Sequence, residues 1–290
     1  MGLKCRAVRR TLLAQQIVVC ISLSFLGIAC TESNTPPQIE AYAYSSAPAT
    51  VRCETGARNG RAGANDGEAS AEGLRYHVRT PSNYDATIAH PLLMVYAAAG
   101  QSGPASERMT GLTPTATASG FVIVYVDHRP LGIPGIEQLG TIPGSVAKKW
   151  CIDEQRVFVT GHSDGGTAAL ALAVLEKTKK VPAAIAPSAA GWTGKDLEAY
   201  QCPASIPVMV MHGVNDSLFP GWGAQTSAWW AACNGCDAVK TKKVEGGCVA
   251  YQGCRPGGAT LYCEGAGSHR DWPNLNRVMI EFFAHPEKFL

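Results

Sequence analysis

The sequence has few charged residues and no excess of either sign. Charged side chains make up 17% of its 290 residues, and the formal net charge is +2. Four basic residues, Lys4, Arg6, Arg9 and Arg10, lie in the first 29 residues, which contain no acid, so the rest of the chain holds 21 basic and 23 acidic residues. Nucleic-acid-binding proteins need a basic patch to contact phosphates. The charge balance therefore argues against a nucleic-acid partner.

The start of the chain also lacks an apolar run of membrane-spanning length. The run IVVCISLSFLGIA follows the basic start MGLKCRAVRR and ends in small residues at position 29. A spanning helix needs about 20 apolar residues, whereas a short apolar run after a basic start is typical of an export signal. We therefore predict an export signal over residues 1–29.

Two kinds of export remain open. LGIAC, which ends at Cys30, resembles the lipobox of bacterial lipoproteins, in which the cysteine is acylated and becomes the mature N-terminus. Gly27 fits that motif less well than leucine would. The alternative is cleavage after Ala29 or slightly later, which releases a free secreted protein. We favour lipidation at Cys30, with membrane attachment at the cell surface, and in both cases the protein is exported.

Residues 30–73 lack any apolar period, and the chain lacks internal repeats and a second domain. Stretches such as TESNTPPQ and ARNGRAGANDGEASAEG are rich in small, polar, glycine and proline residues, which is typical of a flexible linker. We therefore predict a linker over 30–73 and a single folded domain over 74–290. The hydrophobic content of 46% is enough for a buried core.

From residue 74 onward, short apolar runs alternate with helical patterns. The runs that predict strands are PLLMVY, FVIVYV, RVFVT, VPAAIA, IPVMVM and ATLYC. Runs that are apolar throughout and separated by helices indicate a mostly parallel sheet with helices on both faces. NLNRVMIEFFAH, at residues 274–285, has the spacing of a terminal helix. The predicted fold class is α/β.

The cysteines indicate an oxidising compartment. Eight of the eleven remain when Cys5, Cys20 and Cys30 are set aside, and an even number in an exported chain predicts disulfides. A zinc site at CNGC is the alternative, but no second, evenly spaced CxxC accompanies it, so we expect no metal. The spacing of these eight cysteines does not determine which of them pair. The one pair we predict is Cys254 with Cys263, which flank RPGG in a predicted hairpin.

The stretch RVFVTGHSDGGTAALALAVL, residues 156–175, carries the strongest chemical motif. GHSDG joins a predicted strand to a predicted helix, which is the context of a nucleophile elbow. In such a turn Ser163 takes a strained backbone conformation, and Gly161 and Gly165 let strand and helix approach closely. The alternative is a loop whose serine only caps the helix. A nucleophile requires an acid and a histidine later in the chain.

Both residues follow at the ends of later predicted strands. IPVMVM leads into HGVNDSLFP, which places Asp216 at a strand's carboxyl end, and ATLYC leads into EGAGSHRDWP, which places His269 before the last helix. The order Ser163, Asp216, His269 is that of a Ser-Asp-His triad. Asp271 is the fallback acid. We expect His162 and His212 to pack beside the active-site loops without a catalytic role.

The chain resembles the α/β-hydrolase esterases that include secreted feruloyl and acetylxylan esterases and polyhydroxyalkanoate depolymerases. The resemblance is carried by CIDEQRVFVTGHSDGG, VMVMHGVND, YQGC with the later YC, and GSHRDWP, which fall between residues 75 and 285. It implies the α/β-hydrolase fold, Ser163 as nucleophile, Asp216 as acid, His269 as base, and no cofactor.

One motif departs from that family. Its oxyanion loop usually begins His-Gly, whereas MVYAAAGQS has Ala97 and Ala98 there. The oxyanion hole needs backbone N–H groups, which we assign to Asp164 and Ala99. Because glycine permits backbone angles that Ala98 would adopt only with strain, we expect a slow enzyme that Ala98→Gly would accelerate.

These residues predict an exported serine esterase that acts on feruloyl or acetyl groups of plant polysaccharide. A polyhydroxybutyrate depolymerase or oligomer hydrolase is the first alternative, although no polymer-binding domain follows residue 290 in this sequence. A non-catalytic surface lipoprotein is the second. Trp272, Trp192 and Trp222 could stack on an aromatic acyl or sugar group, or could only pack in the core or at its rim. We expect a monomer whose partner is the ester substrate.

Overall fold

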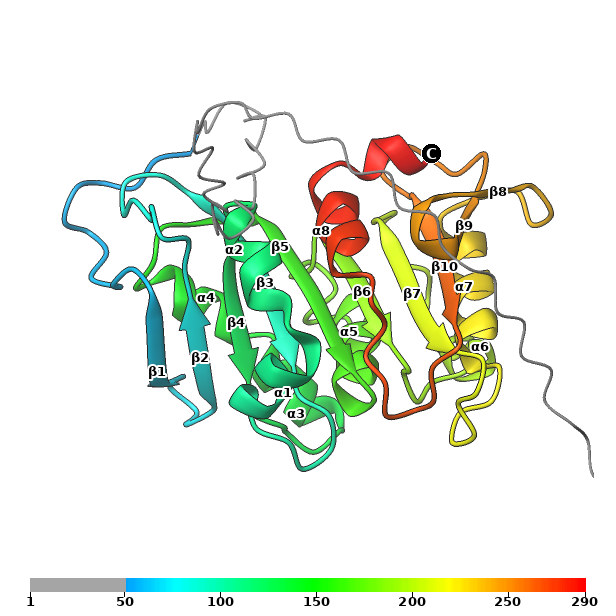
Figure 1. The fold of residues 1–290 in the computed structure, drawn as a ribbon, viewed down its shortest axis with the longest axis horizontal. Helices are drawn as coiled ribbons and strands as arrows, with labels where there is room; N and C mark the ends of the chain where they lie inside the picture. Colours follow the sequence, from blue (N-terminus) through cyan, green and yellow to red (C-terminus); the bar gives the residue numbers. More distant parts are fainter. Residues whose placement is uncertain (1–50) are drawn as a thin grey trace, which may run out of the picture. The chain divides into compact units, whose positions relative to one another are not determined.

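The computed structural model describes residues 51–290, which are built around one ten-stranded sheet (Figure 1). The strand order is β1-β2-β4-β3-β5-β6-β7-β10-β9-β8. All neighbours from β4 to β10 in this order are parallel. These parallel strands are β4 (Val122–Val126), β3 (His90–Tyr96), β5 (Ile152–His162), β6 (Ala184–Ser188), β7 (Val208–Gly213) and β10 (Thr260–Gly265). Each coincides with one of the predicted apolar runs, so the α/β prediction is confirmed.

Antiparallel strands extend the sheet at both edges. β2 (Arg75–Arg79) pairs with β4, and β1 (Ala64–Ala69) pairs with β2. At the other edge β9 (Cys248–Tyr251) pairs with β10, and β8 (Thr241–Lys243) pairs with β9. Of the described strands, only β1 and β8 are true edge strands. β2 and β9 alternate buried and less buried residues, because an antiparallel strand can pack one face on the core and leave the other face toward solvent.

Helices cover both faces of the sheet (Figure 1). One face carries α1 (Gly103–Thr110), α2 (Leu112–Ala118) and α8 (Asn276–Ala284). The other carries α3 (Ile133–Leu139), α4 (Ile142–Ala147), α5 (Asp164–Val174), α6 (Gly194–Leu197) and α7 (Trp222–Cys233). Two 3-10 helices, η1 (Glu245–Gly247) and η2 (Pro286–Phe289), complete the order.

Alternating side chains of the strands divide the core into two halves. In β3, Leu92 and Met94 belong to the half beneath α5, whereas Leu93 and Val95 belong to the half beneath α8. All four are fully buried. A strand enclosed on both faces is apolar at every position, which is why these strands read as continuous apolar runs in the sequence.

The folded region begins earlier than predicted, because residues 51–73 are part of it. β1 pairs with β2, Arg52 forms a bridge with Ile88, and Cys53 forms a disulfide with Cys151. These residues were assigned to the linker because they lack an apolar period. β1 is an edge strand held by backbone bonds and is mostly exposed, so it does not need that period.

The described residues contain four disulfides, and the predicted Cys254–Cys263 bond is wrong. The bonds are Cys53–Cys151, Cys202–Cys233, Cys236–Cys254 and Cys248–Cys263. β9 and β10 form the antiparallel pair, and Cys263 lies directly opposite Cys248. Cys254 follows β9 outside both strands, where it reaches Cys236 after α7. Both cysteines of CNGC are therefore oxidised, which fits an exported protein.

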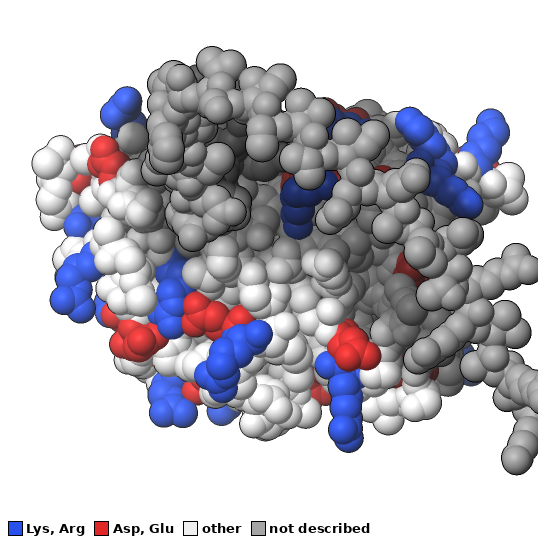
Figure 2. Space-filling view, viewed as in Figure 1, with Lys and Arg blue, Asp and Glu red and all other residues white. Residues whose placement is uncertain are grey.

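Basic and acidic side chains are interspersed on the face of the described chain shown in Figure 2, without a large patch of one sign. None of the helices within residues 51–290 is long and apolar enough to cross a bilayer. The predicted export signal, Cys30 and the first part of the predicted linker lie outside the described residues.

Candidate active site

Ser163 lies in a sharp turn between β5 and α5. Its φ of 55° and ψ of −118° place it in a backbone conformation that L-residues rarely adopt. The turn also needs glycine on both sides. A Cβ added to Gly165 would lie 1.9 Å from the Tyr96 carbonyl oxygen, and one added to Gly161 would lie 2.5 Å from the Gly165 backbone. The geometry is that of a nucleophile elbow, as GHSDG predicts.

Backbone hydrogen bonds fix the turn from both sides. The Ser163 N–H donates to the Ser188 carbonyl at the end of β6, at 3.0 Å. Thr167, one turn along α5, donates its hydroxyl to the Ser163 carbonyl and accepts the Gly191 N–H. These bonds stabilise the strained conformation at Ser163.

The structure brings Ser163, His269 and Asp216 into one hydrogen-bonded chain. His269 Nε2 lies 2.9 Å from Ser163 Oγ, and His269 Nδ1 lies 2.8 Å from Asp216 Oδ2. The three residues follow β5, β10 and β7, whose carboxyl ends share one edge of the sheet. The Asp216 side chain is fully buried, whereas that of His269 is 18% exposed. A substrate can therefore approach the imidazole, while the carboxylate is shielded from solvent.

The surroundings of Asp216 favour its ionised form. Burial by itself raises the pKa of its carboxyl, but hydrogen bonds from His269 and from the backbone of Phe219 and Leu218 outweigh it, so the net pKa is lowered. Oδ1 accepts both backbone N–H groups at 2.9 Å, which leaves Oδ2 for His269. Asp271, the fallback acid, instead accepts the N–H and hydroxyl of Ser268 and is exposed.

Two buried histidines hold the loops that carry the acid and the base. His162 Nε2 lies 2.6 Å from the His269 carbonyl, and His162 Nδ1 lies 3.1 Å from Ser188 Oγ. His212 Nε2 lies 2.8 Å from the Phe219 carbonyl. Both are packed beside the active-site loops, as expected. The bonds of His162 have no signal in the sequence, because they join residues far apart in the chain.

The oxyanion loop differs from the sequence-based expectation in where its strain lies. The Gln101 N–H donates to the Ala98 carbonyl, so residues 98–101 form a turn, and its left-handed position is Gly100, with φ of 68°. Ala98 does not have a positive φ. The expected strain at Ala98 is therefore wrong, because the turn already has a glycine where one is required.

The two predicted oxyanion donors lie in suitable segments. Asp164 is the first residue of α5, where the N–H has no acceptor inside the helix. Ala99 is exposed, and no backbone hydrogen bond of residues 51–290 uses its N–H. Both groups are therefore free to bind an oxygen atom.

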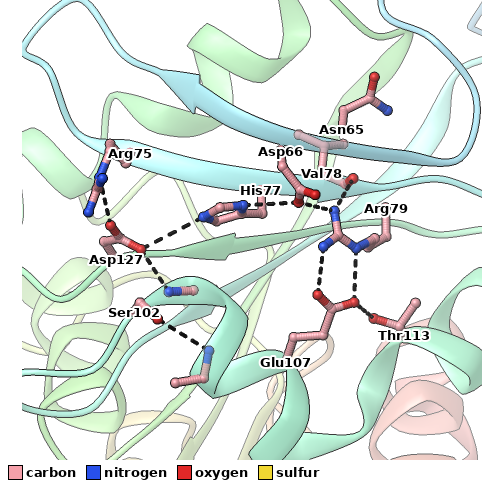
Figure 3. Close-up of polar contacts among 12 residues, drawn as sticks. Asn65, Asp66, Arg75, His77, Val78, Arg79, Ser102, Glu107, Thr113 and Asp127 are labelled. Atoms are coloured by element: carbon pink, nitrogen blue, oxygen red, sulfur yellow. Dashed lines mark hydrogen bonds and ion pairs between the residues drawn. The ribbon is translucent and has the colours of Figure 1, made fainter.

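The helix that follows this loop is held by a network of charged residues (Figure 3). Asp127 accepts the N–H of Gly103, the first residue of α1, at 2.7 Å and also pairs with Arg75. Glu107, in the middle of α1, forms a two-pronged ion pair with Arg79 of β2. The network ties α1 to the sheet and so fixes the end of the oxyanion loop.

The three predicted substrate-contacting tryptophans occupy different surroundings. Trp222 stacks on Phe219, with ring centroids 4.6 Å apart, and the Phe219 ring stands edge-on to His269. Trp192 stacks on Tyr200 and lines a cavity of about 130 Å³ beside α5. Trp272 donates its indole N–H to Asn276 and packs against the core half that contains α8. Trp222 is therefore linked to the triad through Phe219.

Among residues 51–290, no group of three or more His, Cys, Asp or Glu side chains is arranged to hold a metal ion. The hydrogen-bonded chain of Ser163, His269 and Asp216 is suited to act as a nucleophile, a base and an acid.

No family model matches the chain, and no curated protein matches its sequence. Solved structures do match. An acetyl xylan esterase from Aspergillus awamori shares 16% identity with a TM-score of 0.54, and the match covers 75% of this chain and 96% of that one. A ferulic acid esterase from the anaerobic fungus Anaeromyces mucronatus shares 15% identity with a TM-score of 0.50, over 82% and 94% of the two chains.

A fluorophosphonate-binding serine hydrolase from Staphylococcus aureus shares 14% identity with a TM-score of 0.54, over 78% of this chain and 99% of that one. At such low identity the likeness concerns the fold. The chain therefore has the α/β-hydrolase fold, as the resemblance implied.

Proposed function

We propose that this protein is an exported serine esterase that hydrolyses carboxylic esters through an acyl-enzyme. The observation that carries the proposal is the chain from Ser163 Oγ through His269 to buried Asp216, with bonds of 2.9 and 2.8 Å. A serine that only caps a helix needs neither this histidine nor a strained backbone. Indeed Ser163 makes no side-chain cap bond to α5.

The geometry of the three residues supports the following steps. His269 Nε2 accepts the Ser163 proton as Oγ attacks the ester carbonyl carbon, and then donates that proton to the leaving alcohol. Asp216 accepts the Nδ1–H and stabilises the imidazolium that forms between the two transfers. Water then attacks the acyl-enzyme with His269 again as base, which releases the acid and restores Ser163.

The N–H groups of Asp164 and Ala99 bind the oxygen that becomes negative in each tetrahedral intermediate. One donor belongs to the elbow and the other to the loop after β3. Their role is supported by the lack of a backbone acceptor for either group within residues 51–290.

The test of this function is hydrolysis of an activated acetyl ester by parent and variants. Ser163→Ala, His269→Ala and Asp216→Asn should each lower kcat by about 10⁴-fold or more, because the three residues act as a unit. Asp271→Asn is the matched control, since its carboxylate binds only its own loop. Full activity in Asp216→Asn would contradict the assigned acid.

For the substrate, we propose feruloyl or acetyl esters of plant polysaccharide. The support is the aromatic pair Phe219 and Trp222, of which Phe219 contacts His269, and the similarity in fold to an acetyl xylan esterase and a ferulic acid esterase. A panel of methyl ferulate, acetylated xylan oligomers and hydroxybutyrate oligomers separates the alternatives. Fastest turnover of hydroxybutyrate oligomers would instead identify a polyester hydrolase. No turnover of any ester would favour a binding lipoprotein.

We further propose that Cys30 is acylated and anchors the protein to a membrane. The support is LGIAC after a short apolar run, together with the disulfides of the folded region. Cell fractionation of parent and Cys30→Ala tests it: the parent should remain with membranes and the variant should not. An unmodified parent N-terminus beyond Cys30 would contradict lipidation and leave the protein as a freely secreted enzyme.

A further inference from the structure

One histidine outside the triad contacts both segments that carry the proposed oxyanion donors. His128 follows β4, and its backbone N–H donates to the Gln101 carbonyl of the oxyanion loop at 3.0 Å. Its Nε2 lies 3.0 Å from Oδ2 of Asp164, the residue after the nucleophile. His128 therefore joins the loop after β3 to the elbow after β5.

The side-chain bond has a defined direction. An ionised carboxylate can only accept hydrogen bonds, so the proton of this bond is on His128 Nε2. A neutral imidazole with its proton on Nε2 makes the bond, and so does an imidazolium. The side chains of His128 and Asp164 are 18% and 29% exposed, so the pair is partly shielded from water.

The position of the Asp164 carboxylate matters for the chemistry. It belongs to the same residue whose N–H is a proposed oxyanion donor, so a carboxylate is attached to the residue that supplies this donor. A fixed negative charge near a developing oxyanion raises the energy of the transition state, and the effect grows where water is excluded. Such a carboxylate must be held in one place and its charge offset.

The other residues that hold the elbow do not bind the Asp164 carboxylate. Ser188 and Thr167 bind the backbone of Ser163 and leave the Asp164 side chain untouched. On the loop side, Asp127 binds the backbone of Gly103, beyond the turn at 98–101. Within residues 51–290, His128 hydrogen-bonds both the Asp164 carboxylate and the loop that contains the turn.

We propose that His128 is a positioning residue for the oxyanion hole. Its Nε2–H fixes the Asp164 carboxylate and offsets its charge, and the same residue holds the turn that presents the second donor. The role rests on the proposed esterase function. It is separate from the triad, because His128 binds neither Ser163 Oγ nor His269.

The first part of the test compares kcat and KM for an activated acetyl ester. His128→Ala should lower kcat about 10-fold with KM nearly unchanged, which is less than the 10² to 10³ typical of losing a whole donor. His128→Gln keeps a donor on a side chain of similar reach and should retain most of the activity. His285→Ala is the matched control, since His285 also pairs with a carboxylate, that of Glu287, but at the end of the chain.

The second part measures the binding of an inhibitor that forms an oxyanion, which a merely structural role of His128 would not change. A trifluoromethyl ketone forms an oxyanion with the nucleophilic serine, so its inhibition constant should rise in His128→Ala by about the factor lost in kcat/KM. Adding Asp164→Asn to His128→Ala removes the uncompensated charge and keeps the backbone N–H. The double variant should therefore recover most of the lost kcat.

The outcomes separate the two proposals. If the parent shows no Ser163-dependent turnover, the esterase function fails and the role of His128 fails with it. If the parent is active, three results contradict the role of His128 alone: parent kcat in His128→Ala, an unchanged inhibition constant, or no recovery in the double variant. Thermal unfolding midpoints of all variants exclude loss of folding as the cause.

Discussion

His162 shows how a buried residue can act on the active site without touching the substrate. It is almost fully buried, and its Nε2 binds the carbonyl of His269 while its Nδ1 faces the hydroxyl of Ser188. Burial lowers the pKa of His162, and although the bond to the His269 carbonyl opposes this, the net pKa remains below its usual range. The neutral ring therefore donates from Nε2 and accepts at Nδ1.

This environment predicts a pH dependence of stability. Because the folded pKa of His162 is lowered, the unfolded chain binds more protons below about pH 6.5, so the free energy of unfolding falls as the pH drops through that range. The groups nearest to it, His269, Asp216 and Asp271, are present in parent and variant alike. When the pH is lowered from about 7.5 to about 5.5, the unfolding midpoint of His162→Gln should therefore decrease less than that of the parent. Equal losses in the two proteins would contradict the prediction.

At the scale of single elements, the nucleophile elbow depends on close approach between β3 and the start of α5. Gly165 lies so near the Tyr96 carbonyl that a methyl group there would overlap it. Because the obstructing atom is backbone, the overlap cannot be relieved by a rotamer change.

Gly165→Ala should therefore destabilise the protein by about 3 kcal/mol or more and abolish turnover. Gly144→Ala in α4 is the control, since a Cβ there meets nothing within 4 Å. It should be neutral or stabilise by roughly 0.5 kcal/mol, because alanine is the better helix former. Chemical denaturation of both variants measures the difference. Similar stability in the two variants would show that the elbow is not as tight as described.

The oxyanion loop gives a second prediction for an element. Its turn has a left-handed residue at Gly100 and none at Ala98. Gly100→Ala forces an L-residue into that conformation at a cost of roughly 1–2 kcal/mol and should lower kcat. Ala98→Gly should leave kcat near the parent value, contrary to what the family pattern suggests. A clear rise in kcat for Ala98→Gly would show that Ala98 does restrain the loop.

The strands that could be predicted from the sequence are those with buried side chains on both faces of the sheet. The runs that became β3, β4 and β7 are apolar at every position, since helices cover both of their sides. The triad could be predicted for a related reason, because each member follows such a strand. β1 escaped prediction, since an exposed edge strand needs no apolar pattern.

Contacts between distant residues could not be predicted. The bonds of His162 to His269 and of His128 to Asp164 depend on which strands become neighbours, and spacing does not encode that order. The wrong cysteine pair has the same origin. Cys254 was placed on a hairpin strand, whereas the strand that pairs with β10 is β9, which brings Cys248 opposite Cys263.

At the scale of the whole molecule, three of the four disulfides join segments outside paired strands, and the fourth links the paired strands β9 and β10. Cys53–Cys151 closes a loop with a sequence separation of 98 and binds the N-terminal part of the described chain to the start of β5. Cys202–Cys233 joins the segment before β7 to the end of α7, Cys236–Cys254 joins the segments that follow α7 and β9, and Cys248–Cys263 joins β9 to β10. Closing a longer loop removes more entropy from the unfolded chain.

Peptide mapping of the unreduced protein should therefore recover four linked pairs with this connectivity and no free thiol among these eight cysteines. The double variant that lacks Cys53 and Cys151 should lose about 3–5 kcal/mol of stability, and the one that lacks Cys248 and Cys263 somewhat less. A peptide linking Cys254 to Cys263 would contradict the described pairing.

The proposed esterase function depends on Ser163 acting as a covalent nucleophile. The most direct measurement is to mix the protein with p-nitrophenyl acetate, quench it with acid during turnover and determine which peptide gains mass. We predict one acetyl group on the peptide that contains Ser163, and none in Ser163→Ala, which should also fail to turn over the ester. Turnover without acetylation of Ser163, or parent rates in Ser163→Ala, would contradict the proposed function.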